Sequence, residues 1–369
     1  MQKNLTWAIA VILVGIVVGA AGYEAYVLSA PPSPCSSVTT PSSPEEVSSV
    51  AHPPATRATD HPTGDVVSGA PTHTAVSPKA RSQPAPAVRA SGEVINVVAA
   101  ENFWGSLVSQ IGGIHANVTS IITDPNTDPH EFESNDSTAV AIKNAQYVIL
   151  NNVGYDDWAT TLIAADGDAN QTVLNIGDSL GTSVTGGIVS GNPHQWYNPT
   201  FVNETVAWMY HNLTTIAPSL TPYFTEQYDN LTASLTALYS EVGAIHHQFS
   251  GTVVASTESI FVYLANATGL DLVSPPAFME AIAEGNDPPD QSVVVFQCQL
   301  ESGHVRVLVF NAQTVTPITT NMKAIAQENN VSLVAVTETI VPPTATFQEW
   351  MGGQLNALYV ALDANALAQ

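Results

Sequence analysis

Two loops of the chain carry a histidine directly after a proline, and their imidazoles are the groups best presented for chemistry. The loops are Asp128-Pro129-His130 and Asn192-Pro193-His194. Proline fixes its own φ and restricts the residue before it, so each imidazole would be held in few orientations before a ligand arrives. Two such loops suggest one shared binding site. The alternative is that each is an ordinary surface turn that contains a histidine.

Three motifs follow one another in an order that resembles a known family. They are Val97-Val98-Ala99-Ala100-Glu101-Asn102-Phe103-Trp104, Asp128-Pro129-His130-Glu131-Phe132 and Pro193-His194-Gln195-Trp196-Tyr197. From about Glu93 to the C-terminus the chain resembles the metal-binding receptors of manganese and zinc ABC importers, the cluster A-I solute-binding proteins. The resemblance implies a protein that captures a transition-metal ion and hands it to an ABC permease in the membrane, and that is not an enzyme.

The elements around the first histidine loop alternate between strand and helix. Strands are predicted over residues 94–100, 118–122 and 147–151, and helices over residues 104–111 and 137–144. Strands separated by helices imply a parallel sheet covered by helices on both faces. Ligands of such sheets bind at the carboxyl ends of the strands, which is where the loop of His130 would fall.

One long helix is predicted in the middle of the chain. Its apolar residues, spaced alternately by four and three, are Phe224, Tyr228, Leu231, Leu235, Leu238, Val242 and Ile245. At about 1.5 Å per residue, a helix over residues 222–247 would be about 39 Å long. We therefore expect an α/β protein of two lobes with parallel sheets, residues 93–221 and 248–369, linked by this rigid helix in a substrate-binding-protein architecture. The alternative, a core helix of a bundle, fits poorly with the strand–helix alternation on either side.

The second lobe repeats the alternation, and two carboxylates follow its strands. Glu258 comes after the strand predicted over residues 251–255, and Glu338 after the strand over residues 331–336. We expect these two carboxylates and the imidazoles of His130 and His194 to face one another across a cleft and to bind one metal ion. In the family that the chain resembles, the position of Glu258 is held by His or Glu and that of Glu338 usually by Asp.

The ligand types suit a borderline-to-hard divalent cation. Imidazole together with carboxylate oxygen admits Mn²⁺, Zn²⁺ or Fe²⁺, and without a cysteine ligand Cu(I) is disfavoured. Zinc receptors of the family often carry a histidine-rich loop in the first lobe. None occurs between Glu131 and Pro193, which favours manganese.

Other side chains near these motifs are predicted to have structural roles. Trp104 and Trp158 are expected in the core, whereas Trp196, next to His194, would line the cleft. The acidic residues Asp136, Asp156 and Asp157 are expected at solvated loop or helix-start positions.

The N-terminal part of the chain reads as a membrane anchor or signal segment followed by a tether. Residues 5–22 carry no charge and could just span a bilayer, so residues 1–30 are predicted to anchor the protein at the cell surface, with a cleaved signal peptide as the alternative. Residues 31–92 hold 12 of the 25 prolines and almost no large apolar residue except valine. Such a segment buries too little surface to offset its ordering entropy, so a disordered tether is expected.

Charge excludes one class of partner. Residues 93–369 contain three basic residues, Lys143, Arg306 and Lys323, against 27 acidic ones. Nucleic acid, which is recognised through its phosphates, is therefore not a partner. A charged fraction of only 11% with so few basic residues favours an acidic exterior, where carboxylates are partly neutralised.

Eight sequons in residues 93–369 support an external location. They begin at Asn117, Asn135, Asn170, Asn203, Asn212, Asn230, Asn266 and Asn330, and predict N-linked glycans on an extracellular protein. We also expect the protein to be a monomer. The two cysteines, Cys35 in the tether and Cys298 in the second lobe, are not expected to form a disulfide.

Two other functions remain open at this point. A zinc-dependent hydrolase would need an open coordination position and a general base, and no HExxH or other catalytic signature is present. A surface adhesin or structural glycoprotein on the same scaffold would have a degenerate site, against which the four ligand-type residues argue.

Overall fold

The computed structural model describes residues 94–127, 129, 132–168, 170–181 and 191–366, together with Cys35. The expected anchor, the rest of the expected tether and the candidate ligand His130 lie outside the described residues. Within the described part of the chain, no helix is both long and apolar enough to cross a membrane.

The first sheet has four parallel strands in the order β2-β1-β3-β4. They are β1 (Ile95–Glu101), β2 (Ala116–Ile122), β3 (Tyr147–Leu150) and β4 (Thr172–Asn175). The helices that connect and cover them are α2 (Asn102–Gly112), α3 (Asp136–Asn144), α4 (Asp157–Asp166), α5 (Ile176–Leu180) and α6 (Pro199–Ile216). Short 3₁₀ turns occur at Gly113–His115, Gln195–Tyr197 and Pro218–Leu220.

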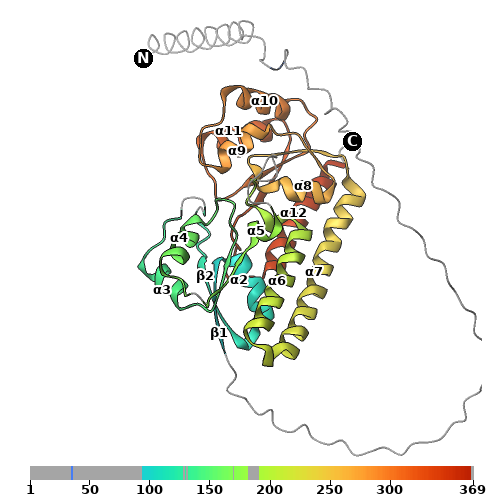
Figure 1. Ribbon diagram of the computed structural model, residues 1–369. Coiled ribbons are helices and arrows are strands. Elements are labelled where there is room, and N and C mark those ends of the chain that lie inside the picture. The colour runs from blue at the N-terminus through green and yellow to red at the C-terminus, as the bar shows by residue number, and fades with distance from the viewer. Residues whose placement is uncertain are drawn as a thin grey trace, which may run out of the picture. The chain divides into compact units, whose positions relative to one another are not determined.

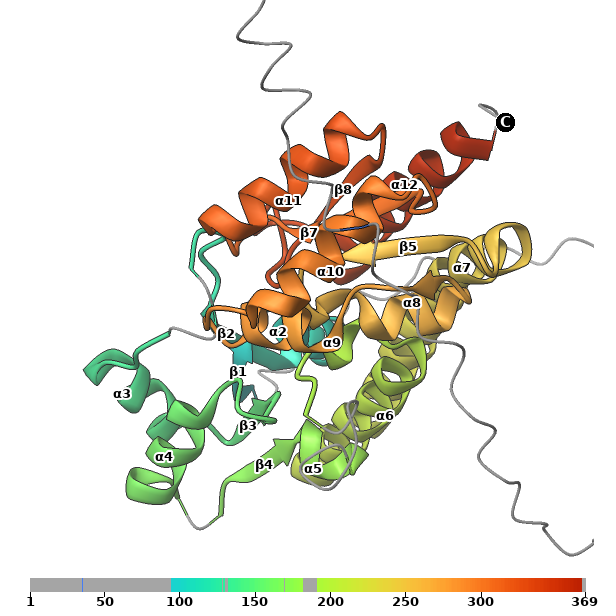
Figure 2. The same ribbon diagram turned by 90° about the horizontal axis from the view of Figure 1, so that it is seen from above.

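The central strand β1 is buried on both faces because helices cover both sides of the sheet. Val97 and Ala99 belong to the core that includes residues of α2, α6 and α7. Val98 and Ala100, on the opposite face, pack with residues of α3 and α4. Figure 2 shows α3 and α4 on one side of β1 and β3, and α6 on the other.

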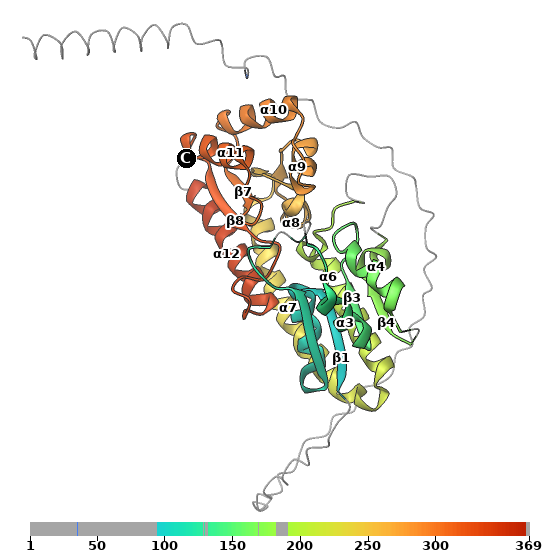
Figure 3. The same cartoon turned by 90° about the vertical axis from the view of Figure 1, so that its left-hand side faces the viewer.

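The second sheet repeats the same order, β6-β5-β7-β8, again with parallel pairing throughout. Its strands are β5 (Val253–Ser256), β6 (Asp271–Leu272), β7 (Val307–Asn311) and β8 (Ser332–Val336). Its helices are α8 (Val262–Thr268), which follows a 3₁₀ turn at Ser259–Phe261, α9 (Pro276–Ala283), α10 (Asp290–Glu301), α11 (Pro317–Glu328) and α12 (Phe347–Ala366). Figure 3 shows the strands of the two sheets as separate groups. The predicted α/β class with two parallel sheets is confirmed.

The long helix α7 (Thr221–Phe249) lies between the two sheets in the sequence and contacts helices associated with both. It packs against α2 and α6 of the first lobe and against α8 and α12 of the second, and Figure 1 shows it beside α6. Six of the seven apolar residues predicted to line one face are buried, and the seventh, Tyr228, stacks on Tyr210 at 4.7 Å. The helix therefore gives both sheets one continuous core.

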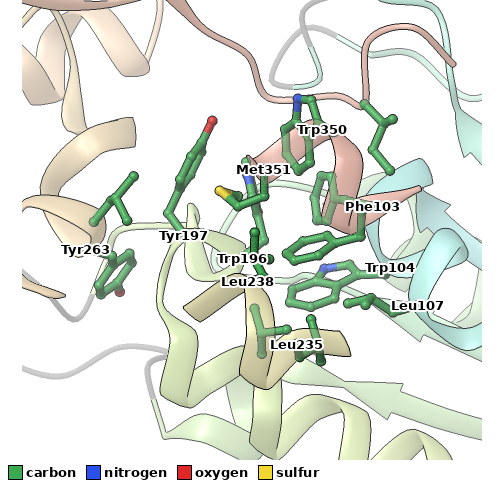
Figure 4. Close-up of a cluster of buried hydrophobic side chains, with 14 of the residues drawn as sticks. Phe103, Trp104, Leu107, Trp196, Tyr197, Leu235, Leu238, Tyr263, Trp350 and Met351 are labelled. Atoms are coloured by element: carbon green, nitrogen blue, oxygen red, sulfur yellow. The ribbon is translucent and has the colours of Figure 1, made fainter. Parts of the chain in front are cut away.

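Aromatic side chains fill the core where the two lobes meet (Figure 4). Phe103 lies 4.1 Å from Trp196 and 6.3 Å from Trp350, measured between ring centroids. Trp196 is 1% exposed, so it packs in this core and does not line an open cleft as predicted. Its bulk fits here because Phe103 and Trp350, from two distant parts of the chain, supply apolar surface that spacing along the sequence does not reveal.

Cys35 and Cys298 form a disulfide, contrary to the sequence prediction. Cys298 lies on α10, and the two Cα atoms are 5.0 Å apart. The prediction relied on the assignment of Cys35 to the tether and of Cys298 to the second lobe. That assignment is a weak argument, because the entropic cost of closing a loop rises only slowly with its length.

Candidate metal site

Two carboxylates and one imidazole converge where the two lobes meet. His194 precedes the 3₁₀ turn Gln195–Tyr197, Glu258 follows β5 and Glu338 follows β8. Each is 0% exposed, and each offers a ligand atom within 4.8 Å of those of the other two. The structure thus brings together three of the four predicted ligands, from both lobes. The fourth, His130, lies outside the described residues.

The tautomer of His194 is set by Asn192. The imidazole Nδ1 lies 2.8 Å from Asn192 Oδ1, and the same oxygen accepts the His194 backbone N–H at 3.0 Å. The amide is oriented by its own Nδ2, which donates to the Ser259 carbonyl at 2.8 Å. Since an amide oxygen only accepts, Nδ1 carries a proton, so Nε2 is the nitrogen that can offer a lone pair to a metal ion. That Nε2 lies 3.5 Å from Glu338 Oε1.

Asn311, the last residue of β7, bridges the two carboxylates. Its Nδ2 donates to Glu258 Oε1 at 2.7 Å and to Glu338 Oε1 at 2.8 Å, and it lies 2.8 Å from Thr314 Oγ1. Tyr155 donates its hydroxyl proton to the other Glu338 oxygen, Oε2, at 3.0 Å. The second Glu258 oxygen, Oε2, is buried and has no hydrogen-bond partner among the described residues.

Gln313 holds the backbone that carries Glu338 in place. Gln313 Oε1 accepts the backbone N–H groups of Glu338 at 2.7 Å and Thr339 at 3.0 Å. Its Nε2 donates across to the carbonyl of Thr127, in the first lobe, at 3.1 Å. The carboxylate is therefore held by a strand end, a side-chain amide and a contact between the lobes.

The charge of this cluster is unfavourable without a cation. Burial, and then the nearby Glu338 carboxylate, raise the pKa of Glu258 well above its ordinary value. A divalent cation would offset both effects, because it neutralises two carboxylates that are otherwise desolvated together. An orphaned carboxylate oxygen, an imidazole lone pair and a second carboxylate form a donor set that fits such an ion.

A second pair of buried carboxyl groups lies in the first lobe. Glu101, at the end of β1, and Asp156, in the loop after β3, are both 0% exposed and lie close enough for their charges to interact. Burial and then the Asp156 charge raise the pKa of Glu101 well above its usual value, and burial raises that of Asp156 to about 6. The prediction that Asp156 is solvated is wrong, because its carboxylate turns inward to accept two backbone N–H bonds. Asp136 and Asp157 are exposed in first helical turns, as predicted.

Sequence reasoning did not identify Asn192, Asn311 and Tyr155 as part of the site. Asn311 ends a strand of the second sheet, so the reasoning that located Glu258 and Glu338 applies equally to it. Asn192 lies two residues before His194 in the same proline-containing loop. Tyr155 carries no such signal, because its role depends on a contact with a residue 183 positions away.

Two α/β lobes joined through a long helix, with a buried His and two carboxylates where they meet, define a two-lobed binding protein with a metal-type site. A family model described as the periplasmic component A of the zinc-uptake complex, ZnuA, matches residues 97–361. The chain belongs to this family of metal solute-binding proteins of ABC import, whose members are periplasmic or extracellular binding proteins and not enzymes.

Solved structures share the fold at low identity. The periplasmic zinc-binding protein TroA from Treponema pallidum aligns with a TM-score of 0.63 at 13% identity, covering 73% of this chain and 99% of that chain. A mutant of the laminin-binding adhesin Lmb from Streptococcus agalactiae gives 0.62 at 18% identity, with coverage of 73% and 99%. The SBP FpvC from Pseudomonas aeruginosa in complex with Mn²⁺ gives 0.60 at 21% identity, with coverage of 74% and 99%.

Proposed function

We propose that this protein captures one divalent transition-metal ion, Mn²⁺ or Zn²⁺, between its lobes and delivers it to an ABC permease. His194, Glu258 and Glu338 are the proposed ligands, with His130 as the fourth. The observation that carries the proposal is the convergence of three fully buried ligand groups from both lobes within 4.8 Å of one another.

The charge balance supports a divalent ion as the cargo. Two carboxylates and a neutral imidazole around an M²⁺ ion form a site with no net charge, and such a site costs less to bury than an unpaired ion. Without the ion, two buried carboxylates share one amide donor group, that of Asn311. Metal binding therefore removes a repulsion at the junction of the lobes and should hold them together.

The proposed ligand set is compatible with more than one divalent transition-metal ion. Imidazole nitrogen and carboxylate oxygen admit Mn²⁺ and Zn²⁺, with Fe²⁺ also compatible. Among the structural neighbours, TroA is described as zinc-binding and FpvC as holding Mn²⁺ or Ni²⁺. We place the protein outside the cytoplasmic membrane as a monomer, held by the apolar segment of residues 5–22, with N-linked glycans on its sequons.

Elemental analysis of protein purified without chelator tests the proposal. We expect close to one equivalent of metal per chain, and loss of that metal in Glu258→Ala, His194→Ala and His130→Ala. His304→Ala, an exposed histidine of the second lobe, is the matched control and should keep its metal. Full metal content in any of the first three variants would remove that residue from the ligand set, and wild-type protein that takes up no ion would end the proposal.

A further inference from the structure

The loop between β3 and α4 has an unusual backbone. Asn152, Val153 and Gly154 have consecutive positive φ angles of 64°, 61° and 76°. Glycine adopts this region freely and asparagine tolerates it, but for a β-branched residue such as Val153 it is an outlier. Strained backbone of this kind persists only where the surroundings hold it, and it occurs most often at functional sites.

Several specific contacts hold the loop in this conformation. The Asp156 carboxylate accepts the backbone N–H groups of Asn151 at 2.6 Å and Asn152 at 2.7 Å. Trp104 Nε1 donates to Asn151 Oδ1 at 3.0 Å. Gly177 allows Val153 to pack closely, because a Cβ at Gly177 would lie 2.6 Å from Val153 Cγ2.

The loop presents two groups to the candidate metal site. Asn151 Nδ2 donates to the carbonyl of Pro193 at 2.8 Å, directly before His194. Tyr155, which is 2% exposed, donates its hydroxyl to Glu338 Oε2 at 3.0 Å, and its ring lies 6.3 Å from the His194 ring. The loop thus contacts one proposed ligand of each lobe.

We propose that Tyr155 is a specificity-determining residue that holds Glu338 Oε2 away from the ion, so that Glu338 binds metal through Oε1 alone. The inference rests on the proposed function. Both Glu338 oxygens accept a hydrogen bond, Oε1 from Asn311 at 2.8 Å and Oε2 from the phenol at 3.0 Å, but Oε1 is the oxygen beside His194, 3.5 Å from Nε2. Glu258 has no such restraint on its Oε2. Tyr155 therefore limits how many oxygens the site offers.

The number of oxygens matters because the two candidate ions differ in coordination. Zn²⁺ is satisfied by four ligands, whereas Mn²⁺ favours octahedral sites rich in oxygen. A site in which one carboxylate is limited to a single oxygen favours the ion with the smaller coordination number. Removing the Tyr155 hydroxyl would free Oε2 and allow Glu338 to bind with both oxygens, which favours Mn²⁺.

The test compares Zn²⁺ and Mn²⁺ dissociation constants of Tyr155→Phe and wild-type protein by competition titration. We expect the ratio of Zn²⁺ to Mn²⁺ affinity to fall about tenfold, and X-ray absorption at the manganese edge to report one more oxygen ligand in the variant. Tyr210→Phe, which removes a phenol hydroxyl bonded to Thr225 on α7, is the control and should leave the ratio unchanged.

A second variant keeps the test decisive if Tyr155→Phe does not fold. Glu338→Asp shortens the side chain by one methylene, so that it cannot reach the phenol and the ion together, and the same fall in the ratio is expected. Affinities for both ions that change by one common factor, or not at all, would overturn the role of Tyr155 while leaving the metal site in place. Wild-type protein that binds neither ion would refute the proposed function instead.

Discussion

The buried pair of Glu101 and Asp156 makes a quantitative prediction about how stability depends on pH. Glu101→Gln replaces a carboxyl group by an amide of the same shape, which can donate a hydrogen bond to Asp156 at every pH. The wild-type side chain can donate only while it is protonated. The variant therefore keeps the shape of the side chain but removes one titrating group from the core of the first lobe.

The direction in which stability changes with pH follows from the direction of the two pKa shifts. Both pKa values are raised in the folded state, so the folded protein retains protons that the unfolded chain releases. The stability that they contribute is fully present below the ordinary pKa values, near pH 4, and is lost as the pH rises through the folded-state values. For Asp156, a rise from 3.8 to about 6 corresponds to a loss of about 3 kcal/mol across that interval. Any other group that stays protonated in the folded state while it is ionised in the unfolded chain lowers the free energy of unfolding by about 1.4 kcal/mol for each unit of pH rise.

The assay is urea unfolding of the metal-free protein in EDTA between pH 3.5 and 8. Wild-type stability should fall as the pH rises above about 4, and the Glu101→Gln curve should be flatter by about 1.4 kcal/mol per pH unit where Glu101 alone retains its proton. Glu258 titrates in both proteins, so its contribution cancels in the difference. Glu241→Gln, at an exposed position on α7, is the control. Parallel curves for the variant and the wild type would refute the assignment of a retained proton to Glu101.

Three further predictions follow from the site and the disulfide. Free metal at about 100 times its dissociation constant should stabilise the protein by about 2.7 kcal/mol, and an unchanged melting temperature on adding EDTA to the loaded protein would contradict an occupied site. Asn311→Ala leaves Glu258 and Glu338 without their common donor and should weaken metal binding about 10–100-fold in a competition titration, whereas wild-type affinity would show that the amide does not position them. Cleavage at a protease site inserted near residue 65 should leave the two fragments joined on a non-reducing gel and separate in Cys298→Ser, and separate wild-type fragments would show that Cys35 is not paired.

The sequence was sufficient for the parts of the fold that rest on local pattern. Strand β3 is an unbroken apolar run and β1 is apolar from Val97 to Ala100, because both faces of the first sheet are covered. Helix α7 shows its period through seven regularly spaced apolar residues. Strands β4 and β6 were missed because they are short edge strands, and polar residues lie at their ends. The positions of Glu258 and Glu338 followed from the rule that side chains after parallel strands meet at one edge of the sheet, whereas His194 was found by its place after a proline in a loop.

The contacts that sequence could not supply are those between distant segments. Asp156 reads as a loop residue, and only the pairing of β1 with β3 brings Glu101 beside it. Tyr155 reaches Glu338 through the meeting of the two lobes. Trp196 reaches Phe103 from a distant segment of the same lobe. The disulfide joins cysteines 263 residues apart, a pairing for which no spacing rule exists.

The central claim is that side chains of both lobes bind one ion, and anomalous diffraction from crystals of the metal-loaded protein tests it most directly. The account predicts a single strong anomalous peak in contact with His194 Nε2, Glu258 and Glu338, with His130 completing the site. A peak bound elsewhere, or one that contacts side chains of only one lobe, would contradict it.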